Sequence, residues 1–191
     1  MLFRSVRTFL WTQSEGRDVQ TPSDELIASP PFVELGPREN QIVRLLYRGG
    51  MPADAERAFH VVVSELPEPA DASPRRARTL GTAISFSMPV FVEPARPGVS
   101  ALSLDLLRAG QADAGLAISN AGTRHARLTA ISLHGAGWSA QLAADLPKTV
   151  LAGGSVALPV PAAALRQLGP GALTARIESD GQTHDVPLRL R

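Results

Sequence analysis

Apolar and polar residues alternate with a period of two in short segments along most of the chain. This alternation is typical of half-buried β-strands, and no long amphipathic helix interrupts it. In the first half, the pattern predicts strands over 6–13, 32–35, 41–48, 57–66 and 80–92. In the second half, it predicts strands over 101–108, 115–119, 126–133, 155–160, 173–178 and 185–190. The predicted fold class is therefore all-β.

Turn-forming residues separate these segments. The sequence EGRD at 15–18 predicts a turn, and Asp180-Gly181 predicts a tight hairpin. One short helix is expected over 162–168, because Pro161 precedes it and Gly169 follows it. Pro89 lies inside the segment 80–92 and cannot donate a backbone hydrogen bond. That segment is therefore predicted to be an edge strand, or to change partners midway.

The best linker in the chain is Pro94–Gly98, which reads PARPG. After it, aromatic residues nearly vanish and Ala, Leu and Gly dominate. The short strands on both sides recur at the spacing of β-sandwiches. We therefore expect two all-β domains, 1–94 and 95–191.

Charge and composition exclude several classes of partner. The chain has 19 basic and 18 acidic residues and a net charge of +1, so it has no long-range field for nucleic acid or an anionic membrane. It contains no cysteine, so a disulfide framework is excluded. No apolar run is long enough for membrane insertion. Arg4 and Arg7 interrupt the first apolar residues, so these do not have the pattern of a signal peptide.

Residues that could carry chemistry are scattered. None of the four histidines has a second histidine or an acidic cluster at metal-ligand spacing. These histidines are His60, His125, His134 and His184. No nucleotide-binding loop or nucleophile elbow is present. We therefore expect no metal, no cofactor, no small-molecule substrate and no catalytic residues, and a binding protein is favoured over an enzyme.

Several motifs in order resemble one family. In the first half they are FLWTQ (9–13), SPPF (29–32), GPRENQIVRLLYR (36–48), ERAFHVVVSELP (56–67) and SMPVFVEP (87–94). In the second half they are SNAGTRHARL (119–128) and PLRL (187–190). The chain resembles the periplasmic chaperones of usher-pathway pilus assembly, in the PapD-like superfamily. Within it, the chain is most similar to the branch called archaic, or spore-coat-U-associated.

The resemblance implies two immunoglobulin-like sandwiches, the first without its signal peptide and first two strands. It also implies pilin subunits and an outer-membrane usher as partners, and the periplasm as location. In this family the last strand of the first domain fills the open core of a pilin, which is donor-strand complementation. Here that strand would be 80–86. The groove-filling face would be Leu80, Thr82, Ile84 and Phe86.

The resemblance also suggests polar sites, with departures. Classical members hold the pilin carboxylate with a basic residue on the last strand, where this chain has Pro89. The replacement anchor is expected to be Arg44 or Arg48, in the adjacent strand region, although a surface arginine without that role fits equally well. Candidates for an ion pair between the domains are Glu65, Glu93 and Arg96.

Two alternatives stay open at this point. The segment 80–86 could be an ordinary core strand, with Ile84 and Phe86 inside their own sandwich. The whole chain could instead be a two-domain adhesive or scaffolding module that binds a protein partner through loops. Arg75 and Arg76 would then carry the interaction.

Overall fold

The computed structural model describes residues 2–52, 54–66, 83–108, 114–135, 137–143, 148–166 and 173–190. Their regular secondary structure consists of β-strands and one short helix. The chain divides into two compact units. The first contains residues 1–11, 20–51 and 58–92, and the second contains residues 12–19, 52–57 and 93–191. No helix within the described residues has the length and apolar composition needed to cross a membrane.

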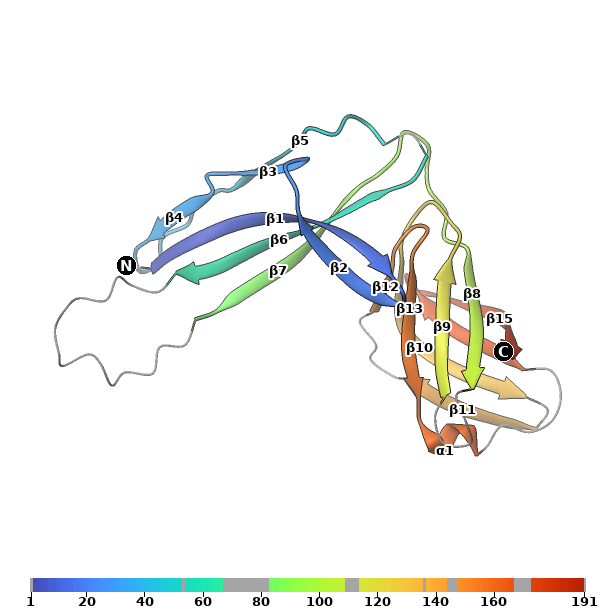
Figure 1. The fold of residues 1–191 in the computed structure, drawn as a ribbon. Helices are drawn as coiled ribbons and strands as arrows, with labels where there is room; N and C mark the ends of the chain where they lie inside the picture. The colour runs from blue at the N-terminus through green and yellow to red at the C-terminus, as the bar shows by residue number, and fades with distance from the viewer. Residues whose placement is uncertain are drawn as a thin grey trace, which may run out of the picture. The chain divides into compact units, whose positions relative to one another are not determined.

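The first unit is built on a five-stranded sheet. Its strands are β1 (Leu2–Ser14), β2 (Arg17–Pro22), β4 (Phe32–Leu35), β6 (Arg57–Leu66) and β7 (Ser85–Val92). The order is β2-β1-β6-β7, and β4 also pairs with β1. Strands β1 and β6 are antiparallel, from the pair Phe3–Leu66 to the pair Leu10–Phe59. Strand β7 lies at the margin of the sheet beside β6 (Figure 1).

A two-stranded sheet of β3 (Leu26–Ser29) and β5 (Arg44–Tyr47) packs against the larger sheet. Their common core consists of Val6, Leu26, Ala28, Phe59 and Val61. Among the described strands, β5 pairs only with β3, so its outer edge is open. Leu45 and Leu46 on β5 are 43% and 62% exposed, on a strand whose two faces are both apolar.

The second unit has one eight-stranded sheet, in the order β11-β10-β14-β15-β8-β9-β13, with β12 paired to β10. The strands are β8 (Leu102–Arg108), β9 (Ala114–Asn120), β10 (Ala126–Gly135), β11 (Trp138–Ala143), β12 (Lys148–Val150), β13 (Ser155–Val160), β14 (Thr174–Ser179) and β15 (Gln182–Leu190). Its core has sixteen buried apolar residues, among them Leu104, Ile118, Leu128 and Ile177. The helix α1 covers Ala162–Leu165.

The hairpin predicted at Asp180-Gly181 is confirmed. Strands β14 and β15 pair next to it, Ser179 with Gln182. Both turn residues have positive φ, 50° and 75°, as a two-residue hairpin turn requires. The predicted EGRD turn is shorter than expected. Only Glu15 and Gly16 form it, with φ of 51° and 75°, and β2 already begins at Arg17.

Other boundaries also differ from the predictions. Strand β5 begins at Arg44, three residues later than predicted. Strands β2, β3, β11 and β12 were not predicted, because they are short or polar and have little alternation. Of the segment 80–92, residues 80–82 lie outside the described residues, and β7 begins at Ser85. Its position at the sheet margin confirms the edge strand predicted from Pro89.

Candidate functional site

The edge strand β7 carries a row of apolar side chains that the protein does not bury. Ile84, just before the strand, Phe86 and Met88 are 49%, 55% and 47% exposed. Spaced by two residues, they share one face of the strand. Val90 and Val92 continue the same row and pack against the core of the first unit. The row therefore begins in the protein's own core and runs out into solvent.

The opposite face of β7 is polar and attached to its neighbours. The hydroxyls of Ser64 and Ser85 lie 2.9 Å apart across β6 and β7. Ser87 Oγ lies 2.9 Å from Nδ1 of His60, and that nitrogen also accepts a hydrogen bond from Gln20 Nε2 at 2.7 Å. An amide nitrogen can only donate, so Nδ1 is an acceptor and the Ser87 hydroxyl donates to it. These contacts hold β7 with its apolar row directed to the other face.

Half of the expected groove-filling face can be located. Leu80 and Thr82 lie outside the described residues. Ile84 and Phe86 are on one face of β7 and about half exposed, so they do not lie inside their own sandwich. The alternative of an ordinary core strand is therefore wrong for these two residues. Met88 belongs to the same row but was not predicted as a site residue, because the expected donor segment ended at Phe86.

The candidate carboxylate anchors lie on or next to β5, which is not a hydrogen-bonded neighbour of β7 among the described strands. Arg44 pairs with Ser29 across the small sheet, and the Arg48 N–H donates to the carbonyl of Glu25 at 2.7 Å. Strand β5 pairs with β3, whereas the neighbour of β7 is β6. Strands β5 and β7 therefore belong to different sheets. Both arginine side chains are exposed, and an anchoring role for either stays a prediction.

The residues expected to link the domains have different surroundings. Glu65 is bound to the start of β7: its N–H donates to the Ile84 carbonyl at 2.9 Å, and its Oε2 accepts from the Ile84 N–H at 3.2 Å. Glu93 and Arg96 are exposed, and neither has an ion pair among the described contacts. Their role between domains stays a prediction.

A different glutamate is buried in an ion-pair geometry. Both carboxylate oxygens of Glu56 lie within 2.9 Å of His125 Nδ1, and the Glu56 side chain is 2% exposed. The backbone N–H of His125 also donates to Oε1 of this carboxylate at 3.3 Å. Both residues belong to the second unit. No local pattern around Glu56 signals burial, so sequence reasoning missed this pair.

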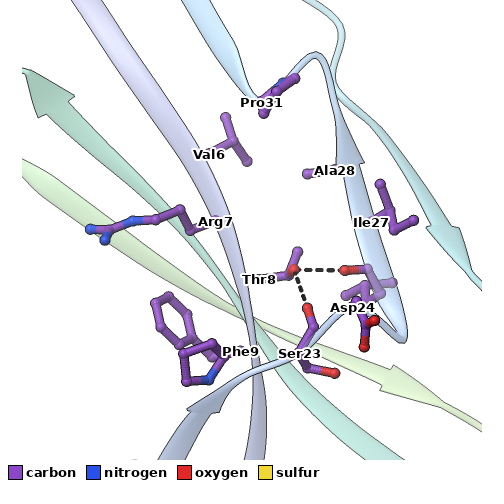
Figure 2. Close-up of a pocket in the computed structure, with 11 residues that line it drawn as sticks. Val6, Arg7, Thr8, Phe9, Ser23, Asp24, Ile27, Ala28 and Pro31 are labelled. Carbon is purple, nitrogen blue, oxygen red and sulfur yellow. Dashed lines mark hydrogen bonds between the residues drawn. The ribbon is translucent and has the colours of Figure 1, made fainter.

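A cleft of about 580 Å³ opens along β1 in the first unit (Figure 2). It lies where the chain leaves the sheet after Pro22. Thr8 Oγ1 bridges the gap by donating toward the carbonyls of Ser23 and Leu26, at 3.2 and 2.6 Å. The Arg7 side chain extends away from Asp24 (Figure 2).

One polar cluster lies on the outer face of the second unit. Ser132 Oγ is 2.8 Å from His134 Nε2, and Arg176 donates twice to Asp185, at 2.8 and 3.0 Å. The hydrogen bonds from Arg176 hold the pKa of Asp185 below its ordinary value, and Asp185 raises the pKa of Arg176. The described hydrogen bonds of Asp185 thus go to an arginine rather than to the histidine. Among the described residues, no group of three acidic or histidine side chains could hold a metal.

An exposed apolar row on an edge strand is suited to pairing with another chain. Residues 5–97 match the family model of the pili and flagellar-assembly chaperone, PapD N-terminal domain. Residues 5–97 are therefore similar in sequence to the N-terminal domain of these chaperones. The matched residues include the whole apolar row of β7. A search of curated proteins gave no sequence match.

Solved structures extend the likeness to the whole chaperone fold. One match is the CsuC–CsuE chaperone–tip adhesion subunit pre-assembly complex from the archaic chaperone-usher Csu pili of Acinetobacter baumannii. Its TM-score is 0.68 at 19% identity, covering 100% of this chain and 86% of that chain. The class 5 fimbriae chaperone CfaA gives 0.59 at 13%, covering 98% and 85%. The Pseudomonas aeruginosa CupB2 chaperone gives 0.54 at 14%, covering 98% and 86%.

At these identities the structural matches show a shared fold. The architecture of the chaperone is the all-β, two-domain immunoglobulin-like fold of PapD-like proteins. The domain match and the fold matches together support the family of pilus-assembly chaperones. Within that fold, the exposed row on β7 is the feature that a binding mechanism has to explain.

Proposed function

We propose that this protein is a periplasmic chaperone that binds pilin subunits through β7 and delivers them to an outer-membrane usher. Binding occurs by donor-strand complementation and involves no catalysed reaction. The observation that carries the proposal is the half-exposed row of Ile84, Phe86 and Met88 on β7, a strand with one edge that no other described strand pairs with. The archaic branch is proposed on the motifs in the sequence and on the likeness to the Csu complex.

The physical basis is the addition of a strand. An edge strand presents unpaired N–H and C=O groups, and a partner strand can satisfy them while pockets take alternate side chains. A long apolar edge is normally an aggregation hazard that proteins avoid. Its retention here is explained if a partner with an open apolar core covers it. A pilin that lacks its own final strand has such a core.

The proposal is tested with the pilin subunits encoded in the genome that encodes this chain. Each is co-expressed with the chaperone, and complexes are isolated by gel filtration. Wild type is expected to form a 1:1 complex. Ile84→Lys or Phe86→Asp is expected to weaken binding at least a hundredfold, because burying an unpaired charge costs several kcal/mol.

The matched control is Ile42→Lys. Ile42 is also exposed in the first unit but lies outside β7, so the same substitution is expected to leave binding unchanged. Arg75→Ala with Arg76→Ala separates the loop-binding alternative, although both arginines lie outside the described residues. If the Ile84 variant binds as wild type does and the loop variant does not, donor-strand binding is refuted.

A further inference from the structure

Pro89 lies where the backbone of β7 faces its open edge. The carbonyl of Ile84 accepts from the N–H of Glu65 on β6 at 2.9 Å, so the backbone of Ile84 faces β6. Strands β6 and β7 run in opposite directions (Figure 1). Along an antiparallel strand, alternate residues direct both backbone groups to alternate sides. The backbone groups of Phe86 and Met88 are therefore directed toward β6. Those of Ser85, Ser87 and Pro89 are directed toward the open edge.

The side chains show that this alternation is unbroken along β7. Ser85 and Ser87 contact Ser64 and His60 on one face. Phe91 lies on that face as well, with its ring 6.0 Å from the ring of Trp11. Val90 and Val92 are on the other face, in the core. A β-bulge between Ile84 and Pro89 would move the later side chains to the opposite faces, and no such exchange is seen. The backbone alternation that starts at Ile84 therefore continues to Pro89, whose backbone faces the open edge.

We infer that Pro89 is the residue at which pairing between β7 and a bound strand stops. This inference rests on the proposed function and adds the register of binding. The open edge offers N–H donors at Ser85 and Ser87, but none at Pro89, where the ring occupies the position of the hydrogen. A partner strand therefore pairs along 84–88 and separates from β7 at 89.

The same position divides the apolar row. Before Pro89, Ile84, Phe86 and Met88 are exposed, and after it Val90 and Val92 pack on the chaperone's own core. The backbone stop and the change in side-chain burial thus coincide. A pilin groove is expected to take the three exposed side chains and no more of the described row. Pro89 thereby selects one register among those that a period-two strand would allow.

Hydrogen exchange measured by NMR on the chaperone–pilin complex tests this register. The probe is the pilin from the same genome that forms the 1:1 complex described above. On binding, exchange at the Ser85 and Ser87 amides is expected to slow by roughly tenfold or more, with the Phe91 amide unchanged. In Pro89→Ala, protection is expected to extend to position 89 and Phe91. Dissociation of the pilin from the Pro89→Ala chaperone is expected to be roughly fivefold slower than from wild type. The variant gains one backbone N–H, and one additional net hydrogen bond gives about this ratio.

Pro159→Ala is the matched control. Pro159 lies in edge strand β13, where the Ala157 N–H donates outward to the Gly16 carbonyl at 3.1 Å, so position 159 also faces outward. It lies in the second unit and is expected to leave pilin dissociation unchanged. If wild type protects Phe91 as strongly as Ser87, or if Pro89→Ala leaves the exchange pattern unaltered, the inference is wrong while the proposed function stands. A complex without protection at Ser85 and Ser87, or no complex at all, overturns the proposed function itself.

Discussion

Asn120 shows how one buried amide can hold together several turns of the second unit. Its Oδ1 accepts from the N–H groups of Ala101 and Gly122, at 2.9 and 3.0 Å. Its Nδ2 donates to the carbonyls of Arg124 and Val150, at 2.8 and 3.3 Å. The residue is 1% exposed. A buried polar side chain with all its hydrogen bonds made stabilises a unique local structure, and it is costly to alter.

Asn120→Asp is therefore expected to lower the free energy of unfolding by about 3 kcal/mol, because two carbonyls would lose their donor and face a buried carboxylate. Urea unfolding followed by circular dichroism measures the change. The matched control is Asn40→Asp, an exposed asparagine for which little change is expected. Equal stability of Asn120→Asp and wild type would contradict this account of Asn120.

Among the elements, the hairpin of β1 and β2 has a tip that belongs to the second unit. Gln13 is its central contact. Nε2 donates to the Thr149 carbonyl at 2.8 Å, and Oε1 accepts from the Leu151 N–H at 3.0 Å. The side-chain amide of Gln13 thus satisfies one backbone carbonyl and one backbone N–H, as the backbone of a paired strand would do. Lys148 donates to Asp18 at 2.7 Å beside it. Covering strand edges in this way is a known protection against unwanted pairing.

Gln13→Ala is expected to cost about 1–2 kcal/mol of stability, since two hydrogen bonds to backbone groups are lost. The Leu151 amide should then exchange faster with solvent, which amide exchange measured by NMR would detect. Gln41→Ala serves as control, because the Gln41 side chain is exposed and its one described hydrogen bond is to the next residue. Unchanged exchange at Leu151 would show that Gln13 does not protect this edge.

Over the whole molecule, the two units differ greatly in how much apolar surface they bury. The described core of the first unit has five buried residues, whereas that of the second has sixteen. Most of the large exposed apolar residues also belong to the first unit, among them Leu45 and Leu46 on β5 and Phe86 and Met88 on β7. Stability grows with buried apolar area, so the first unit is the weaker one.

The two tryptophans report on this difference separately. Trp11 lies in the first unit and Trp138 packs against the core of the second. In the single-tryptophan variants Trp138→Phe and Trp11→Phe, the fluorescence of Trp11 is expected to change at a lower urea concentration than that of Trp138. Coincident transitions would show instead that the chain unfolds as one cooperative unit.

The sequence by itself determined the all-β class and the hairpin at Asp180-Gly181, and for the strand around Pro89 it left an edge position or a change of partners. These follow from local physics: a period of two, two residues with positive φ, and a missing N–H. The division at 94 stays a prediction. The motifs also carried the family resemblance, because they lie in order along the chain.

Only the tertiary structure decided which side chains meet. It extended the exposed row to Met88, placed Arg44 and β7 in different sheets, and paired Glu56 with His125 across 69 positions of the sequence. Alternation along a strand shows which residues share a face, but not whether anything covers that face. Ile84 and Val90 have the same pattern in the sequence. One is exposed, and the other packs on a core to which residues far away in the sequence, such as Val6, Leu26 and Phe59, contribute.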